Sequence, residues 1–293
     1  MHIGIAGYGP MAATWQKYLE SGSETGTISQ LARLDRPGNI DACIVLANQV
    51  YDQFTSAGQT ASGDPILKAL KKGVHLLWVG ALPSDYQQII TWHASAAESG
   101  SVFMFALWGH YAPTTQWLST HVSSPHKIHI HREWPGPKHT PDNDTLHRLF
   151  LEELSLSIGW MRSRPIRCQG DSPLLYSNNP DYVPAAQWFF TFANGGRLTI
   201  SCQPYGMENR HSRFLYGKKL SATCQINDHI IKKWLADDQV SHTPEIMHFD
   251  HPLPAQHILS HFFRAVRTGK KPLFGVDELL DLTSIISELT RET

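Results

Sequence analysis

Short apolar runs alternate with longer helical stretches along the first part of the chain. Ile3–Ala6 is an apolar run, a glycine turn follows it, and helix-forming residues extend from Met11 to Gly22. After a Pro-Gly break the chain continues with an apolar run over Ala42–Ala47, and helix and strand patterns then alternate through HLLWV and SVFMFAL. Strands that alternate with helices predict a parallel sheet with helices on both faces.

The pattern changes past about Trp117, where strands follow one another without helices between them. WFFTFANGGRLTISC contains two strand-like runs around an Asn-Gly-Gly turn, and HKIHIHREW and LSATCQINDHIIKKW are also typical of strands. These features favour an antiparallel sheet. A helix is predicted in TLHRLFLEELSLSIGWM, and two helices close the chain. The predicted fold class is a truncated Rossmann-like parallel α/β domain, residues 1–118, followed by an α+β domain with a mainly antiparallel open sheet, residues 119–293.

The turn after the first strand fits the pattern G-x-G-x-x-G/A at the start of a helix. Gly7 allows a tight turn, Gly9 lets the backbone approach a pyrophosphate, and Ala12 lets the helix lie close to the sheet. Amide groups at the start of the helix would face the anion. The glycines could instead serve packing alone. The predicted contacts of a bound NAD or NADP are Gly7, Tyr8, Gly9, Pro10, Met11, Ala47 and Asn48.

No second strand is predicted after this turn. Ser23–Thr27 is polar, and Ser29–Leu34 has the pattern of a short helix. A dinucleotide-binding domain normally has a strand there that ends in an Asp or Glu for the ribose. Asp35 and Arg36 could take this role, but a solvated helix end is the interpretation we favour. The parallel domain is therefore predicted to be shortened.

Composition limits the partners and the compartment. The 25 basic and 26 acidic residues leave a formal charge of -1, which argues against nucleic acid or an anionic membrane as the main partner. Four cysteines without a C-x-x-C spacing indicate neither a disulfide framework nor a cysteine zinc site. The chain start has no signal-peptide pattern and no apolar run reaches spanning length. We expect a cytoplasmic protein whose partner is a small metabolite or another protein.

Two histidine pairs have spacings that can bind a metal. His129 and His131 alternate on a predicted strand, and His257 and His261 are one helical turn apart. Neither pair has an evident third ligand, so no metal site is predicted.

Aromatic and histidine residues near strand ends are the predicted substrate pocket. Trp108 and His110 follow a parallel strand, where this kind of fold binds ligands. Trp134 lies in HREWPGPKH, which is predicted to form a loop over a cleft, although packing of the ring is an alternative.

Five segments spread along the chain carry a resemblance to a known enzyme family. They are IGIAGYGPMA, NIDACIVLANQVYDQ, ILKALKKGVHLLWVGALPSD, FTFANGGRLTISC and HFFRAVRTGKKPLFGVDELL. Together they resemble the glucose-fructose oxidoreductase, inositol dehydrogenase and MocA family, in the family's order and over nearly the whole chain. The resemblance implies a Rossmann domain that binds NAD or NADP and a second domain whose open sheet often mediates oligomerisation. It also implies hydride transfer to sugars, cyclitols or other carbonyl and imine substrates.

The chain departs from the family at the end of the fourth family strand. The family typically has Glu-Lys-Pro there, whereas this chain has Val79, Gly80 and Ala81. The family lysine, which supports the substrate hydroxyl and the nicotinamide, falls on Gly80. Glycine has no side chain that could do either.

The family's Asp and His, one turn apart in a helix of the second domain, are also replaced. Counting back from Trp160, the acid–base His falls on Glu153 and the Asp on Leu149. Glu153 and the nearby His147 are the predicted proton-transfer residues, because a buried carboxylate or a histidine can titrate near neutral pH. Each could instead be a structural or surface residue.

Two functions are therefore open. The leading one is a diverged oxidoreductase that reduces a C=N or C=O group of a small biosynthetic metabolite with NADH or NADPH. The alternative is a cofactor-free enzyme, a ligand-binding protein or a non-catalytic subunit that has lost nicotinamide binding. In either case the open sheet is expected to pair with a second copy or with another chain. The glycine turn favours the first function, whereas Gly80 and the missing strand favour the second.

Overall fold

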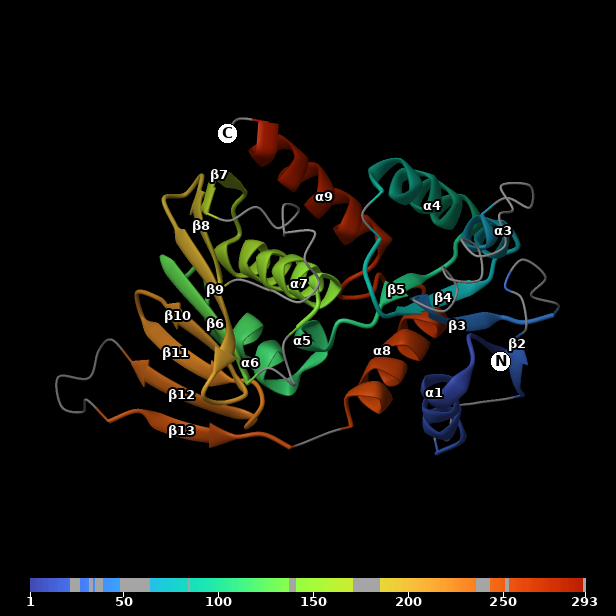
Figure 1. Cartoon of the computed structure of the whole chain (residues 1–293), viewed down its shortest axis with the longest axis horizontal. Helices are drawn as coiled ribbons and strands as arrows, with labels where there is room; N and C mark the ends of the chain where they lie inside the picture. Colours follow the sequence, from blue (N-terminus) through green and yellow to red (C-terminus); the bar gives the residue numbers. More distant parts are fainter. Residues whose placement is uncertain are drawn as a thin grey trace. The chain divides into compact units, whose positions relative to one another are not determined.

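The computed structural model divides into two compact units (Figure 1). The described residues are 1–21, 27–31, 34, 39–47, 64–83, 85–136, 141–170, 185–235, 243–250 and 253–291. The first unit comprises Met1–Trp108 with Pro252–Ser284, and the second comprises Gly109–His251 with Ile285–Thr293. The division predicted at residues 118 and 119 did not anticipate that the segment near the end of the chain returns to the first unit.

The first unit is built on a five-stranded parallel sheet with the strand order β2-β1-β3-β4-β5. The strands are β1 (Ile3–Ala6), β2 (Ile28–Leu31), β3 (Ala42–Leu46), β4 (His75–Val79) and β5 (Phe103–Phe105). Every residue of β1, β3 and β5 is buried. Continuous apolar runs are what a parallel strand needs when helices cover both faces of its sheet, and the predicted parallel sheet is confirmed.

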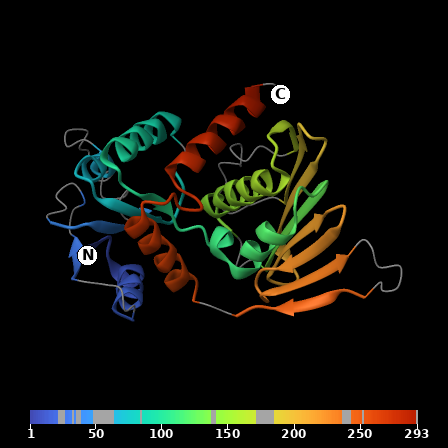
Figure 2. The same cartoon turned by 180° about the vertical axis from the view of Figure 1, so that it is seen from behind.

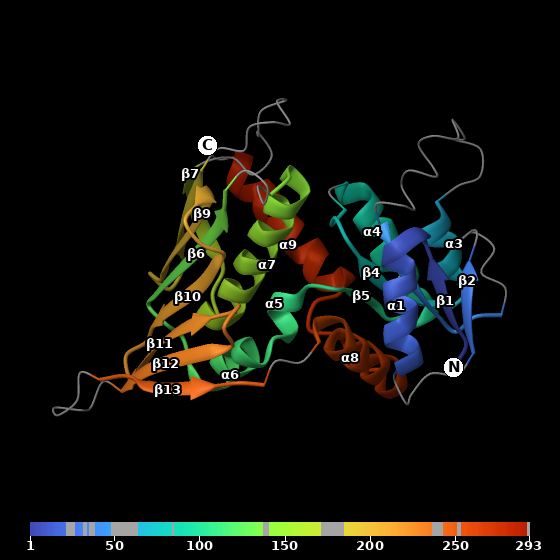
Figure 3. The same cartoon turned by 60° about the horizontal axis from the view of Figure 1, so that its bottom comes forward.

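Helices cover both faces of this sheet (Figure 1 and Figure 3). Helices α1 (Gly9–Ser21) and α8 (Pro254–Thr268) lie on one face, and α3 (Pro65–Lys71) and α4 (Tyr86–Ser99) lie on the other. Helix α9 (Val276–Arg291) closes the chain.

Two aspartates begin the helices α3 and α4. The side chain of Asp64 accepts hydrogen bonds from Ile66 N and Leu67 N, and Asp85 does the same for the start of α4. An N-cap aspartate typically stabilises a helix by about 1 kcal/mol, because it satisfies amides that have no partner within the helix. The other carboxylate oxygen of Asp64 accepts a hydrogen bond from Trp92 Nε1 at 2.5 Å, which ties α4 to the start of α3.

The predicted helix at Ser29–Leu34 is wrong, and so is the prediction that the second strand is missing. Residues Ile28–Leu31 form β2, parallel to β1, with Ile3 opposite Ile28. Leu31 and Leu34 are three residues apart, a spacing typical of a helix, and a four-residue edge strand is too short to show an alternating pattern. Pairing with β1 decides the conformation. Asp35 and Arg36 lie outside the described residues.

The second unit is built on an eight-stranded sheet with the order β13-β12-β11-β10-β6-β9-β8-β7. Its strands are β6 (Lys127–Pro135), β7 (Pro165–Gly170), β8 (Ala186–Phe192), β9 (Arg197–Gly206), β10 (Arg210–Tyr216), β11 (Leu220–Gln225), β12 (Ile230–Leu235) and β13 (Glu245–His248). Neighbouring strands are antiparallel except for the parallel pair of β6 and β9. The predicted hairpin is confirmed: residues 193–196, which include Asn194, join β8 to β9, with Gly195 at a positive φ of 81° that favours glycine.

One face of this sheet packs against helices (Figure 1 and Figure 2). The helices are α6 (Pro113–His121) and α7 (Asn143–Met161), with the short α5 (Trp108–Tyr111) before them. Asp142 begins α7 by accepting a hydrogen bond from Thr145 N at 2.7 Å. All residues from Leu149 to Leu154 are buried, so the middle of α7 lies within the protein. No helix in the described ranges is both long enough and apolar enough to cross a bilayer.

Candidate functional site

A buried ion pair joins α7 to β10 in the second unit. The side chains of Glu153 and Arg213 are both fully buried. Arg213 Nε donates to Glu153 Oε2 at 2.8 Å, and Nη2 donates to Oε1 at 2.5 Å, so the guanidinium meets the carboxylate edge to edge. His211 Nε2 also donates to Glu153 Oε1 at 2.9 Å, and Arg213 Nη1 donates to Thr115 Oγ1 at 2.6 Å. Both charges are therefore paired and hydrogen-bonded, as buried charges must be.

The ion pair keeps Glu153 ionised. Burial alone would raise the pKa of Glu153, but the charge of Arg213 and the hydrogen bond from His211 outweigh it and lower the pKa to about 2. A carboxylate with so low a pKa neither carries a proton at neutral pH nor accepts one readily. The geometry suits a fixed charge that holds Arg213 and His211, and the predicted role of Glu153 in proton transfer stays a prediction.

Glu152, the neighbouring residue on α7, has the opposite environment. Its Oε1 accepts a hydrogen bond from Gly109 N at 2.5 Å. Burial, together with the charge of Glu153, raises the pKa of Glu152 to about 7. Two adjacent carboxyl groups with pKa values pushed apart are the arrangement that lets one carry a proton while the other stays charged.

Gly109 makes this arrangement possible by its lack of a side chain. A Cβ atom at Gly109 would lie 2.6 Å from Glu152 Oε1 and 2.7 Å from Arg213 Nη2. Both distances are shorter than real contacts, so a larger residue at this position would require the Glu152 and Arg213 side chains to shift.

The other histidines predicted for the site are held neutral. His147 is half-buried on α7, and burial lowers its pKa. His110 is only 6% exposed, and burial, with the nearby charge of Arg213, lowers its pKa to about 3. Trp108, the last residue of the first unit, lies edge-on to His257 of α8 with ring centroids 6.0 Å apart.

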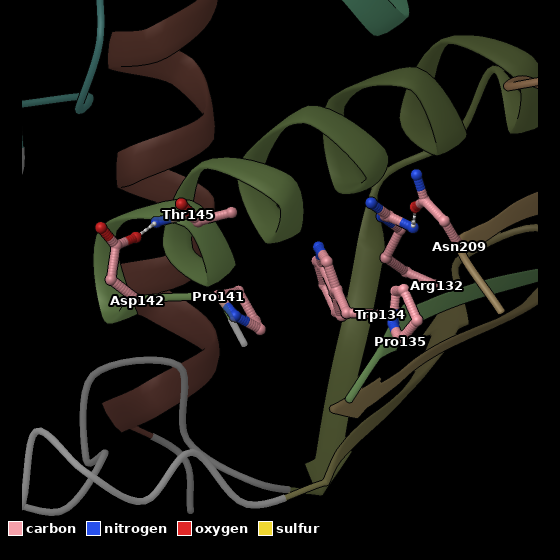
Figure 4. Close-up of a pocket in the computed structure, with 7 residues that line it drawn as sticks. All are labelled: Arg132, Trp134, Pro135, Pro141, Asp142, Thr145 and Asn209. Atoms are coloured by element: carbon pink, nitrogen blue, oxygen red, sulfur yellow. Dashed lines mark hydrogen bonds between the residues drawn. The ribbon is translucent and has the colours of Figure 1, made fainter. Parts of the chain in front are cut away.

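A pocket of about 620 Å³ lies in the second unit, where β6 ends and α7 begins (Figure 4). Its lining residues are Arg132, Trp134, Pro135, Pro141, Asp142, Thr145 and Asn209. The Arg132 guanidinium stacks on the Trp134 ring, 4.4 Å from its centroid. Arg132 lies opposite His211 in the β6–β10 register, so the pocket adjoins the buried ion-pair network along the same face of the sheet. Trp134, one of the three predicted pocket residues, thus lines a pocket.

The glycine turn of the first unit lies between β1 and α1. Gly7 and Gly9 have φ values of 148° and 75°, which favour glycine, and Ala12 is buried against the sheet as predicted. Tyr8 and Met11 are 51% and 49% exposed. The first turn of α1 contains no acidic residue.

Of the two further cofactor contacts predicted from the sequence, Ala47 is buried directly after β3 and Asn48 lies outside the described residues.

The two histidine pairs lie as their spacings predict. His129 and His131 share one face of the sheet, where their rings lie 3.4 Å and 3.1 Å from Ser201 Oγ. The Nε2 atoms of His257 and His261 are 3.3 Å apart. Among the described residues, no group of three or more His, Cys, Asp or Glu side chains could hold a metal ion.

Several residues of the site were not predicted from the sequence. They are Glu152, His211 and Arg213 in the buried network, and Arg132, Asp142, Thr145 and Asn209 in the pocket. A signal for Glu152 existed: the two glutamates of LEEL interrupt the apolar stretch LFLEELSLSIGW. Charges in the middle of an apolar helix indicate burial with partners rather than a solvated face.

Known proteins resemble this chain in structure rather than in sequence. No protein-family model matches the chain, and neither does any curated protein. UDP-N-acetylglucosamine 3-dehydrogenase GnnA from Acidithiobacillus ferrooxidans is 15% identical with a TM-score of 0.77, over 99% of this chain and 96% of that one. The dehydrogenase MviM from Clostridium difficile is 11% identical with a TM-score of 0.75, over 100% and 99%.

Levoglucosan dehydrogenase, solved as a complex with NADH, is also 11% identical with a TM-score of 0.75, over 100% of this chain and 98% of its own. Identities this low establish the fold alone. The chain has, over its full length, the fold of these dehydrogenases, which is the fold that the family resemblance implies.

Proposed function

We propose that the protein is an NAD(P)H-dependent oxidoreductase that reduces a C=O or C=N group of a small metabolite. The glycine turn carries this proposal: Gly7 and Gly9 take positive φ angles between β1 and α1, in a fold shared with dehydrogenases. NADH in the levoglucosan dehydrogenase structure supports a nicotinamide cofactor on this scaffold.

The residues around the turn fit a dinucleotide. Amide groups at the start of α1 suit a pyrophosphate, and the absence of acidic residues in its first turn leaves nothing there to repel one. A Cβ atom at Gly9 would meet nothing within 4 Å, so the space next to its backbone is open. Gly7–Met11 would hold the pyrophosphate, and Ala47 and Asn48 are further proposed contacts. When bound, the nicotinamide would supply the hydride.

The second unit offers groups for the proton that must accompany the hydride. Glu152 fits this role best, because its raised pKa of about 7 lets it carry a proton near neutral pH. Glu152 would take the same proton back in the reverse reaction, and His147, whose pKa is lowered by burial, is the second candidate for this exchange. Glu153, the residue after Glu152, fixes Arg213 and His211 by hydrogen bonds.

A second candidate function is favoured by one observation. Gly80 follows β4 with a φ of 121° and has no side chain where the resemblance places a lysine. A protein without that lysine could be a cofactor-free enzyme, a ligand-binding protein or a non-catalytic subunit. An imine substrate would need the lysine less, because its own nitrogen accepts the proton.

Titration of the purified protein with NADH and NADPH tests the proposal, with nicotinamide fluorescence and thermal stability as two readouts. We expect micromolar binding by the wild type. Gly9→Asp should weaken it by about tenfold or more, because it places a carboxylate where the phosphates approach.

Gly195→Asp is the matched control, since Gly195 has a similar φ of 81° and equally open surroundings but lies in the β8–β9 turn. It should bind both cofactors like the wild type. Absence of binding to either cofactor by the wild type would overturn the proposal and favour the second candidate.

A further inference from the structure

The positive charge of Arg132 has no carboxylate partner in the described part of the chain. Arg132 Nη1 donates to Glu133 O at 2.6 Å, to Asn209 Oδ1 at 2.7 Å and to Arg210 O at 2.9 Å, and all three acceptors are neutral. The Glu133 carboxylate is engaged elsewhere, with Met207 N and the His131 ring. Among the described residues, the Arg132 guanidinium therefore contacts no carboxylate, although Asp142 lines the same pocket.

The Nε and Nη2 atoms of Arg132 form the edge of the guanidinium that can bind a carboxylate side-on. Its Nε and Nη2 atoms make no hydrogen bond with any described residue, and neither is among the buried polar atoms that lack a partner. In Arg213 the same two atoms meet both oxygens of Glu153. The equivalent edge of Arg132 is thus available for a carboxylate from outside the described chain, in the side-on geometry that arginine prefers.

The rest of the pocket supplies an apolar wall and hydrogen-bonding groups (Figure 4). The Trp134 ring stands between Arg132 and the start of α7, so the lining residues lie on both sides of it. Asp142 uses Oδ1 to cap α7, and no described residue bonds its Oδ2 or the Thr145 hydroxyl. A carboxylate oxygen and a hydroxyl group suit the hydroxyl groups of a ligand, and an aromatic ring suits its carbon frame.

We propose that this pocket binds a small hydroxylated monocarboxylate of the sugar-acid class. The ligand carboxylate binds Arg132 Nε and Nη2, its hydroxyl groups bind Asp142 and Thr145, and its carbon frame lies against Trp134. A monoanion is favoured over a phosphate dianion, because Asp142 would repel a second negative charge. The proposal rests on the proposed function in one respect, namely that this ligand is the substrate of the oxidoreductase.

Binding without cofactor tests the pocket by itself. Glucuronate, galacturonate and gluconate are titrated at up to millimolar concentrations, with glucose and galactose as neutral controls, by calorimetry and by thermal stability. We expect the protein to bind at least one acid about tenfold to a hundredfold more tightly than the neutral sugars, as a charge-assisted pair implies.

The variant Arg132→Gln should lose this preference for the acid, and Arg132→Lys, which keeps the charge but not the two-atom edge, should retain part of it. Arg210→Gln is the matched control: Arg210 lies next to the pocket on β10, but its guanidinium pairs with Glu208. It should bind like the wild type. Circular dichroism and unfolding of each variant show whether it is folded.

Three results would overturn the inference: equal binding of acids and neutral sugars, no binding of any acid, or an acid preference that survives in Arg132→Gln. NADH titration of the same samples separates it from the proposed function. Cofactor binding without acid binding overturns the pocket assignment alone, whereas acid binding without cofactor binding overturns the oxidoreductase and leaves the pocket assigned.

Discussion

Arg213 and Arg132 lie on the same face of the second sheet, on the neighbouring strands β10 and β6, and their surroundings are opposite. Arg213 is fully buried, and its Nε–Nη2 edge meets the Glu153 carboxylate. Arg132 is half-buried against Trp134, and its equivalent edge meets no described carboxylate. The difference separates a charge that serves the fold from one that we propose serves a ligand, because a partly desolvated charge without a described partner is more readily retained at a functional site.

The paired arginine also supports Arg132, which meets no described carboxylate. Glu153 holds His211 as well as Arg213, and His211 lies opposite Arg132 in the register of the two strands. A binding group placed on a regular strand, next to a hydrogen-bonded network, keeps a defined position without a ligand. The buried network is therefore expected to fix the base of the pocket.

The largest expected effect is the contrast between Arg213→Met and Arg132→Met. Arg213→Met leaves Glu153 buried without its partner and should lower the free energy of unfolding by about 3–5 kcal/mol. Arg132→Met removes hydrogen bonds to neutral acceptors but leaves no buried charge without a partner, so the free energy of unfolding should fall by only about 1–2 kcal/mol. Urea unfolding of the two variants, followed by tryptophan fluorescence, measures both values. Similar losses would remove the distinction between the two arginines.

A second prediction concerns the pH dependence of stability that Glu152 introduces. Burial raises its pKa from 4.5 to about 7, so the folded protein keeps a proton that the unfolded chain releases above its lower pKa. The stability from this group is complete below the unfolded pKa and is lost as the pH rises through the folded pKa. The free energy of unfolding that Glu152 contributes, and that is lost over this pH range, is about 3 kcal/mol.

The variant Glu152→Gln keeps an oxygen for Gly109 N and does not titrate. Its stability relative to the wild type should therefore increase between about pH 5 and about pH 8, by an amount of this order. Thermal or urea unfolding of both proteins across that range gives the difference and removes the contributions of the histidines, which both proteins share. A constant difference would mean that Glu152 titrates normally and is unsuited to hold a proton near neutral pH.

The sequence is sufficient to predict those elements whose conformation is determined by their own residues. β1 has the predicted bounds because four apolar residues precede a glycine turn, and the β8–β9 hairpin follows from its Asn-Gly pair. β2 could not be predicted, because a four-residue edge strand takes its conformation from β1.

The site was harder to predict because its properties also depend on residues that are distant in the sequence. Glu152 and Glu153 are adjacent and identical in type, and their pKa values differ because Glu153 pairs with Arg213, sixty residues further along the chain, and with His211. Trp134 could be named because an aromatic residue among prolines is visible locally. The open edge of Arg132 could not, since it depends on how β6, β10 and α7 pack.

The smallest expected effect tests how closely the backbone approaches the paired network. Gly109→Ala places a Cβ atom 2.6 Å from Glu152 Oε1, which accepts a hydrogen bond from Gly109 N, and 2.7 Å from Arg213 Nη2, which is held by Glu153. The free energy of unfolding of the variant should fall by about 1–3 kcal/mol, as in an overpacked core.

Gly159→Ala is the matched control, because Gly159 is exposed near the end of α7 and a Cβ there meets nothing within 4 Å. Removing a helical glycine should stabilise the protein by about 1 kcal/mol, so the two substitutions are expected to have opposite signs. If Gly109→Ala were as favourable as Gly159→Ala, the carboxyl of Glu152 would have room to move away from Gly109. The burial that raises the pKa of Glu152 would then not be fixed by close packing against Gly109.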